Sequence, residues 1–388
     1  MSLNFVLIGT PDDRRGTLFQ QALQYQDLAP ARFVSYLDLL ADPGLIADLL
    51  QPDTIVRIES PGKSQQVERA ILASGAEIAD PEEEGYQRRY ERISKRTLAA
   101  LPFEKGQILS SRQWYLGYRH LLQQLKPVLD GHILMNRPED ILVMFDKRAC
   151  HALLQEHQIA VPSALPLVHS YDELMACLQR HRWSRVFIKP AHGSSASGII
   201  AYRFQGARHQ AISTIESVRL GGQYRLYNTR QIRVYTELSE ITALIDALCA
   251  QRVHVEQWIP KASYAQYVFD CRIVVIAGEA HHTVVRLSRS PFTNLHLLNQ
   301  RGDLAAVRAA IGEMRWQEAM QTVERAARLF DSLYTGVDLL FSTDYIRHAI
   351  VEMNAFGDLL PGVLLGGQDT YGAEITALLK ATSHAIHS

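Results

Sequence analysis

The sequence has 388 residues, of which 47% are hydrophobic and 21% are charged, and its formal net charge is -1. This length suffices for two or three packed domains. The near-neutral charge excludes the broad basic surface by which proteins attract nucleic acid or anionic membranes. The four cysteines form neither a C-x-x-C pair nor a zinc-type cluster with histidine, which favours free thiols in a reducing compartment.

The first apolar run, at residues 5–8, is much shorter than the apolar core of a signal peptide. No stretch approaches the roughly 18 apolar residues of a membrane-spanning helix. We therefore expect a soluble, cytoplasmic protein with neither a membrane nor a nucleic acid as its partner. The sequence does not indicate an oligomeric state.

Residues 1–130 alternate short apolar strands with helices. Strands are expected at 4–8, 32–36 and 53–58, and helices at 17–25 and 45–50. This alternation predicts an α/β domain with a parallel sheet, in which ligands bind beyond the carboxyl ends of the strands. Arg57 lies at such an end, where it is a candidate anion contact or an ordinary surface arginine.

Two helices further along the chain carry apolar stripes. The first is expected within the charged and aromatic segment 81–126, and its stripe indicates core packing by Tyr115, Tyr118, Leu122 and Leu125. The second is expected from Trp316 to Tyr334, and its buried face would place the strand that follows it. That face is formed by Met320, Val323, Ala327 and Phe330.

Two candidate phosphate-binding elements come next. Asp146 is expected to cap a helix that begins with Lys147, although a lysine in a first helical turn is usually solvated. Lys189 ends an apolar strand that enters a Gly/Ser loop at 192–198, and a second strand leaves that loop. Gly193, Ser194 and Ser195 could bring backbone and hydroxyl donors to a phosphate. A merely flexible hairpin tip is the alternative.

The segment 253–260 is expected to form a strand that Pro260 ends. Its backbone could hydrogen-bond an adenine, with Trp258 as an apolar wall. An ordinary core strand with Trp258 packed inside is equally compatible with the pattern.

A hairpin is expected from two strands at 270–275 and 281–287. Arg272 and Arg286 lie on opposite arms, where both could face one cleft and neutralise the charge of a leaving phosphoryl group. The alternative is salt bridging on the sheet surface, which we prefer for Arg289.

The last quarter of the chain offers oxygen ligands at strand ends. Asp338 ends one strand, and Glu352 and Asn354 share one face of the next. Carboxylate and amide oxygens without cysteine or histidine suit Mg²⁺, which commonly binds carboxylates together with nucleotide phosphates. In isolation, such a pattern is more often a pair of solvated acids.

In this order, these elements resemble the ATP-grasp superfamily across about 140–361. The most similar branch contains ribosomal-protein-glutamate ligase and glutathione synthetase, which join carboxylates to amines. The resemblance rests on seven motifs: Asp146-Lys147, Ile188-Lys189-Pro190 with the Gly/Ser loop, Glu256-Gln257-Trp258-Ile259, Asp270-x-Arg272, Arg286 with Thr293-Asn294-Leu295-His296, Gly336-Val337-Asp338 and Glu352-x-Asn354.

The resemblance implies an ATP-grasp fold of class α/β, in which two lobes clasp ATP. The expected units are an N-terminal α/β domain (1–130), a central lobe (131–255) and a C-terminal lobe (256–388). It also implies a role for each site residue. The phosphates would be contacted by Lys147, Lys189, Gly193, Ser194 and Ser195, and the adenine would be surrounded by Glu256, Gln257, Trp258 and Ile259. The metal would be bound by Asp338, Glu352 and Asn354, and catalysis would involve Arg286 and Arg272.

We therefore expect a ligase that uses ATP and Mg²⁺, with Mn²⁺ as an alternative ion. It would join a carboxylate to an amine, in peptides or small molecules, through an acyl phosphate and release ADP. Two alternatives remain open: a kinase on the same scaffold that phosphorylates a hydroxyl, and an ATP-binding module that has lost catalysis. The residue that contacts the ribose is not identified by the sequence.

Overall fold

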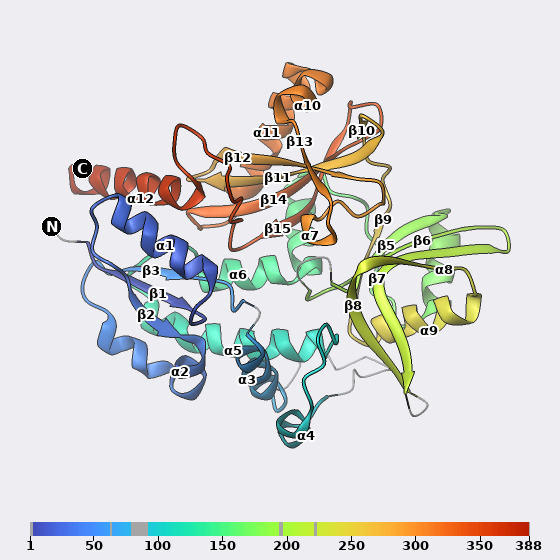
Figure 1. Cartoon of the computed structure of the whole chain (residues 1–388), viewed down its shortest axis with the longest axis horizontal. Coiled ribbons are helices and arrows are strands. Elements are labelled where there is room, and N and C mark those ends of the chain that lie inside the picture. The colour runs from blue at the N-terminus through green and yellow to red at the C-terminus, as the bar shows by residue number, and fades with distance from the viewer. Residues whose placement is uncertain (1–2, 63, 79–91, 194–196, 221–222, 388) are drawn as a thin grey trace.

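A computed structural model describes residues 3–62, 64–78, 92–193, 197–220 and 223–387. Within these ranges the chain folds into three β-sheets with helices packed around them (Figure 1). The mixed α/β class expected from the sequence is confirmed.

The N-terminal residues form a four-stranded parallel sheet in the order β2-β1-β3-β4. Its strands are β1 (Phe5–Gly9), β2 (Arg32–Ser35), β3 (Ile55–Ile58) and β4 (Ile133–Leu134). Its helices are α1 (Arg14–Tyr25), α2 (Tyr36–Ala41), η1 (Pro43–Leu49), α3 (Gln65–Gly75), α4 (Lys95–Ala100) and α5 (Ser111–Leu129). The expected parallel sheet is thus confirmed, whereas the helix expected at 45–50 is the 3₁₀ helix η1.

Helix α5 crosses helix α3 at a pair of glycines. A Cβ atom on Gly75 would lie 2.0 Å from the carbonyl oxygen of Gln113, and one on Gly117 would lie 2.0 Å from that of Ile71. No side chain fits at this crossing, so the two backbones meet directly. The apolar stripe expected on this helix is confirmed, because all four of its members are buried: Tyr115, Tyr118, Leu122 and Leu125.

A second, five-stranded sheet is antiparallel and has the order β8-β7-β6-β5-β9. Its strands are β5 (Arg185–Pro190), β6 (Ile200–Gln205), β7 (Arg208–Leu220), β8 (Gln223–Tyr235) and β9 (Val253–Gln257). Helices α8 (Tyr171–His181) and α9 (Leu238–Cys249) pack against it and share its hydrophobic core. The hairpin expected around the Gly/Ser loop is therefore confirmed as β5 and β6.

The third sheet is also antiparallel, in the order β13-β12-β11-β14-β15, with β10 paired to β11. Its strands are β10 (Ser263–Tyr264), β11 (Tyr267–Ile276), β12 (Glu279–Ser288), β13 (Gln300–Gly302), β14 (Tyr334–Phe341) and β15 (His348–Asn354). The remaining helices are α6 (Pro138–Phe145), α7 (Lys147–Glu156), η2 (Leu295–Leu297), α10 (Leu304–Ile311), α11 (Glu313–Ala327) and α12 (Thr370–His387). The stripe on α11 is buried as expected, but this helix ends at Ala327, before Phe330.

The parallel sheet and the third sheet share their hydrophobic cores. One cluster joins Val56 of β3 to Ile273 of β11, and another joins Leu7 of β1 to Val274 of β11. The main core of the five-stranded sheet is separate from both. The molecule therefore consists of one large body and a smaller lobe beside it, as the ribbon shows (Figure 1).

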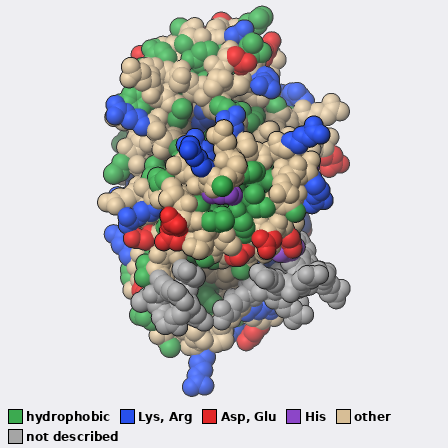
Figure 2. Space-filling model, turned by 90° about the vertical axis from the view of Figure 1, so that its right-hand side faces the viewer, with side chains coloured by type: hydrophobic (Ala, Val, Ile, Leu, Met, Phe, Trp, Pro, Cys, Tyr) green, Lys and Arg blue, Asp and Glu red, His purple; other side chains and the backbone are tan. Residues whose placement is uncertain are grey.

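The surface on the side of the smaller lobe intersperses basic and acidic side chains over its described part (Figure 2). This mixture accords with the near-neutral net charge of -1. None of the described helices combines the length and the apolar character needed to cross a bilayer.

Arg57 is neither an anion contact nor a surface arginine, because its side chain is 1% exposed. Its guanidinium lies 2.7 Å from Glu59 Oε1 and 2.6 Å from Glu374 Oε2 of helix α12. Three aromatic rings surround the guanidinium at 4.3 to 4.7 Å: Phe19, Tyr334 and Tyr371. Arg57 therefore ties the parallel sheet to the C-terminal helix and to β14.

Replacing Arg57 with methionine should lower the free energy of unfolding by about 3–5 kcal/mol, since Glu59 and Glu374 would lose their buried partner. Urea unfolding followed by circular dichroism measures this change. Arg308→Met provides the control, because Arg308 pairs with Glu313 at the surface and should contribute less than about 1 kcal/mol. Equal losses of unfolding free energy in the two variants would contradict the stabilising role assigned to the buried ion pairs of Arg57.

Stability should also depend on pH through Glu374. Burial raises the pKa of this carboxyl to about 7, despite the nearby Arg57. Between its unfolded pKa near 4.5 and this value the folded chain binds more protons than the unfolded chain, so stability falls as pH rises. The unfolding free energy of the wild type relative to Glu374→Gln should drop by roughly 3 kcal/mol across that window. A difference independent of pH would contradict the raised pKa.

Candidate active site

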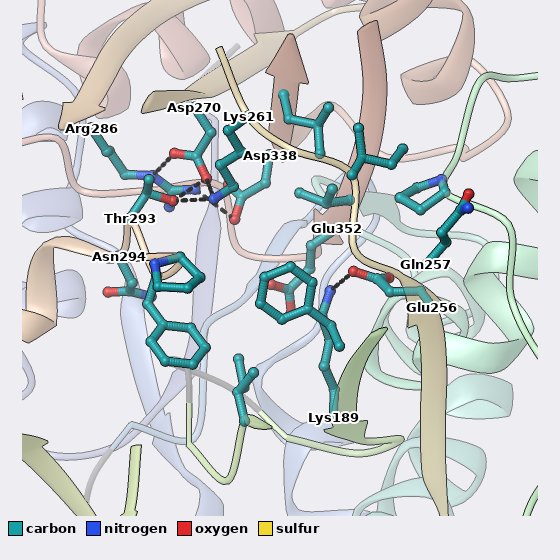
Figure 3. Close-up of a pocket in the computed structure, with 18 residues that line it drawn as sticks. Lys189, Glu256, Gln257, Lys261, Asp270, Arg286, Thr293, Asn294, Asp338 and Glu352 are labelled. Carbon is teal, nitrogen blue, oxygen red and sulfur yellow. Dashed lines mark hydrogen bonds and ion pairs between the residues drawn. The ribbon is translucent and has the colours of Figure 1, made fainter. Parts of the chain in front are cut away.

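An open pocket of about 660 Å³ lies between the five-stranded sheet and the third sheet. Lys189 enters from β5, while Asp338 and Glu352 enter from β14 and β15, and all three reach this cavity (Figure 3). Seven residues expected in the site line the pocket: Lys189, Glu256, Gln257, Ile259, Arg286, Asp338 and Glu352. Strands far apart in the sequence thus present their charged side chains to a single cavity.

The β5–β9 pair supplies the wall that carries Lys189. Lys189 lies opposite His254, and Phe187 lies opposite Glu256, which places all four side chains on one face. The Lys189 ammonium lies 2.5 Å from Glu256 Oε1, and His254 Nε2 lies 3.3 Å from Glu256 Oε2. Burial would raise the pKa of Glu256, yet Lys189 and His254 lower it to about 2. Glu256 is therefore a buried anion that orients Lys189.

Lys147 begins helix α7, and Asp146 caps that helix as expected. The Asp146 carboxylate accepts hydrogen bonds from the backbone N–H groups of Arg148 and Ala149 at 3.0 and 3.2 Å. The Lys147 ammonium donates to the Gly193 carbonyl at 2.6 Å and to Glu352 at 2.7 Å. Lys147 does not line the pocket itself, but it joins the Gly/Ser loop to a carboxylate that does.

The Gly/Ser loop needs glycine at Gly198, whose φ is +73° and whose Cβ would lie 2.9 Å from a ring carbon of Pro190. Before this turn, the Gly193 carbonyl accepts a hydrogen bond from the Lys147 ammonium. Ser194 and Ser195, which the sequence assigned to phosphate binding, lie outside the described residues.

The adenine-binding segment expected at Glu256 to Ile259 runs along the pocket, but Trp258 does not line it. The Trp258 ring packs 5.3 Å from the ring of Phe187, and Phe187 faces the cavity. The backbone N–H groups of Gln257 and Trp258 donate to Ser163 and Arg185 at 2.8 and 3.3 Å. Trp258 therefore packs against Phe187 and does not contact the cavity directly.

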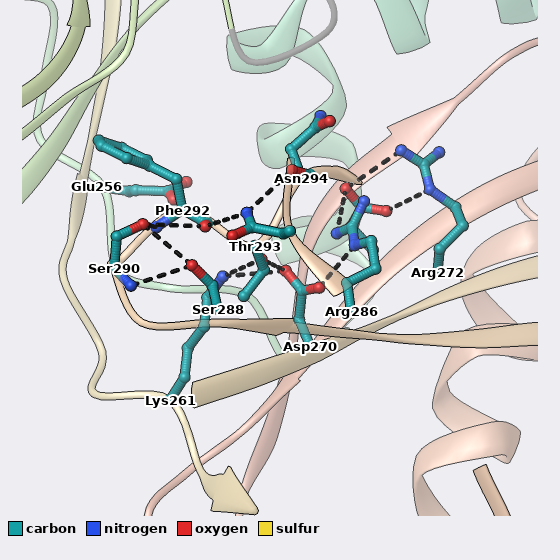
Figure 4. Close-up of polar contacts among 12 residues, drawn as sticks. Glu256, Lys261, Asp270, Arg272, Arg286, Ser288, Ser290, Phe292, Thr293 and Asn294 are labelled. Carbon is teal, nitrogen blue, oxygen red and sulfur yellow. Dashed lines mark hydrogen bonds and ion pairs between the residues drawn. The ribbon is translucent and has the colours of Figure 1, made fainter. Parts of the chain in front are cut away.

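A chain of alternating charges follows the third sheet (Figure 4). Arg272 Nε lies 2.7 Å from Asp338 Oδ1, and Arg286 Nη2 lies 3.0 Å from Asp338 Oδ2. Arg286 Nε also reaches Asp270 at 2.7 Å, and Asp270 in turn holds Lys261 at 2.9 Å. Arg286 lines the pocket, whereas Arg272 does not line it and contacts Asp338 from behind, so three cations share two buried carboxylates. Arg289, by contrast, is exposed and packs on Tyr267.

Lys261 and Thr293 complete this group, and Lys261 is absent from the expected site. The Lys261 ammonium donates to Thr293 Oγ1 at 2.6 Å, and the Thr293 hydroxyl donates to Asp270. Burial lowers the pKa of Lys261 against the opposing effect of Asp270. Lys261 follows Pro260, beyond the end of strand β9 at Gln257, so the alternation of that strand does not predict its place in the pocket.

The three expected metal ligands lie on neighbouring strands. Asp338 is paired with Glu352 across β14 and β15, and Asn354, two residues on, is paired with Gly336. The Asn354 amide nitrogen lies 3.5 Å from the Gly336 carbonyl. Burial raises the pKa of Asp338 in spite of Arg272 and Arg286. Its buried Oδ1 lacks a hydrogen bond of good geometry among the described residues. Two carboxylates opposite each other on neighbouring strands, with an amide two residues further on, form a set of oxygen donors that fits a hard cation such as Mg²⁺.

Across the described ranges, no three histidine, cysteine, aspartate or glutamate residues form a metal-binding group. A cation at Asp338 and Glu352 would therefore complete its coordination with the Asn354 amide and with oxygen atoms from outside the protein.

Solved structures with a similar fold are ATP-grasp proteins. "ATP-grasp ligase PsnB complexed with minimal precursor, Mg, and ADP" has a TM-score of 0.51 at 16% identity, with 98% of each chain covered. D-cycloserine synthetase DcsG has a TM-score of 0.53 at 13% identity, with 97% of this chain and 99% of that chain covered. Macrocyclase MdnC from Microcystis aeruginosa MRC, bound with precursor peptide MdnA, has a TM-score of 0.50 at 12% identity, with 97% and 99% covered. At these identities the similarity shows a shared fold.

No match was found among curated protein sequences. The family described as YheC/D like ATP-grasp, however, has a sequence model that matches residues 142–335. These residues include Lys147, Lys189, strand β9, Arg272 and Arg286. The chain belongs to the ATP-grasp family.

Proposed function

We propose that this protein is an ATP- and Mg²⁺-dependent ligase that joins a carboxylate to an amine through an acyl phosphate and forms ADP. The observation that carries the proposal is the convergence of Lys189, Arg286, Asp338 and Glu352 on one cavity. Cations and carboxylates lining the same pocket match a triphosphate that binds together with its metal ion. The shared fold with ATP-grasp ligases supports a ligase over other ATP-dependent enzymes.

In this proposal the apolar side of the pocket holds the adenine. Phe187 and Ile199 approach from the smaller lobe, and Leu340 and Val351 approach from the third sheet. Ile259 lies at the connecting segment between them. Lys189 and Lys147 then contact the phosphates, and the carboxylates of Asp338 and Glu352 hold Mg²⁺ with Asn354. When bound, Mg²⁺ neutralises phosphate charge and fixes the orientation of the terminal phosphate.

The two arginines act where charge develops. An oxygen of the substrate carboxylate attacks the γ-phosphorus, the bond to the β-phosphate oxygen breaks, and ADP leaves. Arg286 faces the pocket and stabilises the transferred phosphoryl group, while Arg272 holds Asp338 from the other side. The amine then attacks the acyl carbon, loses a proton and displaces phosphate, which completes the amide bond.

The substrates proposed here are a carboxylate and an amine in peptides or small molecules. PsnB and MdnC were solved with precursor peptides, and this supports including peptides among the candidates. The proposed units are the N-terminal domain (1–130), the central lobe (131–255) and the C-terminal lobe (256–388). A cytoplasmic location is supported by the four cysteines, all free and buried: Cys150, Cys177, Cys249 and Cys271.

The proposed reaction is tested by trapping the acyl phosphate with hydroxylamine. The purified protein, ATP and Mg²⁺ are incubated with a panel of amino acids and acidic peptides, and hydroxamate and ADP are measured. Lys189→Met and Glu352→Gln should each reduce both products at least about a hundredfold, because the first removes a cation proposed to contact the phosphates and the second a carboxylate proposed to hold their metal ion. Arg289→Met should retain wild-type activity, since Arg289 is exposed and lies against Tyr267.

The outcome also separates the alternatives. A stable phosphorylated hydroxyl product without hydroxamate would replace the ligase by a kinase. Binding of Mg·ATP without turnover on the whole panel would favour a non-catalytic module. Full activity of Lys189→Met would contradict the assigned phosphate site, whatever the reaction.

A further inference from the structure

We propose that His192 is a positioning residue. It keeps Lys147, whose ammonium bonds the Gly193 carbonyl, in the position from which Lys147 contacts the nucleotide phosphates. It belongs to a relay of three buried side chains, Arg112, His192 and Asp146, that begins outside the ATP pocket. This inference rests on the proposed function, because it presumes that Lys147 contacts phosphate. It adds a residue, and a connection to helix α5, that the proposed reaction chemistry does not require.

The His192 ring is enclosed by three elements. Its side chain is 0% exposed, and its Nε2 lies 3.1 Å from Asp146 Oδ2. The same nitrogen lies 3.2 Å from Nη1 of Arg112 on helix α5. Tyr115, one turn further along α5, stacks on the ring at 4.1 Å between centroids. Helix α5, helix α7 and the Gly/Ser loop thus meet at one imidazole.

The hydrogen-bond chemistry fixes how this ring works. A carboxylate only accepts, so the bond to Asp146 requires the hydrogen on His192 Nε2. In that tautomer Nε2 cannot also accept from Arg112, whose guanidinium lies beside the ring at 3.2 Å as a neighbouring charge. The ring therefore holds Asp146 by donation, while Asp146 caps the helix that begins with Lys147.

The consequence for the phosphate contacts is direct. The backbone N–H of Lys147 donates to the Ala191 carbonyl at 2.9 Å, immediately before His192. The Lys147 ammonium donates to the Gly193 carbonyl, immediately after it. Lys147 is therefore held on both sides of His192, and a displaced imidazole would move the ammonium and the loop together.

Helix α5 connects this relay to the large body. Tyr118, three residues after Tyr115, places its hydroxyl 3.0 Å from that of Tyr36 in helix α2. The segment before α5 pairs with strand β8, where Asn228 N–H donates to the Gly106 carbonyl at 2.7 Å. Helix α5 and the segment before it therefore contact helix α2, the edge of the smaller lobe and His192.

The test compares two substitutions at His192 in the full-length protein. His192→Gln keeps an N–H that can reach Asp146, whereas His192→Ala removes it. The dissociation constants for AMP and for the Mg²⁺ complex of the β,γ-imido analogue of ATP are measured by calorimetry. His192→Ala should weaken binding of the ATP analogue about tenfold. It should leave AMP binding within about twofold, because AMP lacks the terminal phosphates, and His192→Gln should recover most of the loss.

A purely structural role would lower the melting temperature and would weaken both ligands alike. Equal losses for AMP and the ATP analogue would therefore overturn the inference. His192→Ala added to Lys147→Met should give little further loss for the ATP analogue, since both act on the same contact. If the double variant binds the ATP analogue about tenfold more weakly than Lys147→Met, the inference is likewise overturned.

The matched control is His209→Gln, because His209 belongs to β7 in the same lobe and contacts Tyr202 outside the pocket. It should leave both affinities unchanged. If the wild type binds neither nucleotide, the proposed function fails and this inference fails with it. If the wild type binds the ATP analogue and His192→Ala binds it equally well, only the inference fails.

Discussion

The pocket depends on the ion pairs that the buried carboxylate of Asp338 forms with two arginines. Strand β11 lies between β12 and β14, so its register places Arg272 opposite Asp338 and Asp270 opposite Arg286. Each buried charge consequently has an opposite charge within 3.0 Å. Removing one member would leave its partner charged and dehydrated, which costs more than the pair contributes. The central strand thus fixes the electrostatics of the site along with its shape.

The distribution of charge explains why such a pocket suits a polyphosphate. Lys189 with Glu256 and Lys147 with Glu352 form two neutral pairs. The longer series sets Arg272, Arg286 and Lys261 against Asp338 and Asp270, and Arg272 also lies 3.6 Å from the partly exposed Asp358. Phosphate oxygens are further anions that such guanidinium and ammonium groups bind through charge-assisted hydrogen bonds. The ion pairs also hold the long lysine and arginine side chains in place before any ligand arrives, which reduces the entropy lost on binding.

Local patterns in the sequence predicted the elements that carry the site. The Asp146 cap, the hairpin around Gly198 and the alternation along β15 depend on residues close together in the chain, and all three were expected. Arg57 was misread because its partner Glu374 is 317 residues away and only the folded chain brings it there. The loop that begins at His192 was expected, but the contact of His192 with Arg112 was not, since Arg112 lies 80 residues before it.

The two kinds of core explain why such distant contacts matter. The parallel sheet and the third sheet pack into one body, whereas the five-stranded sheet is built mainly around its own cluster of apolar side chains. A pocket between them depends on how the smaller lobe is held against the larger body. Close packing would hold the lobe rigidly only if the cores were continuous. The alignment between the lysines of one wall and the carboxylates of the other therefore depends on small contacts between the bodies: the apolar cluster of Phe187, Ala201 and Phe292, and the ion pair of Lys147 with Glu352.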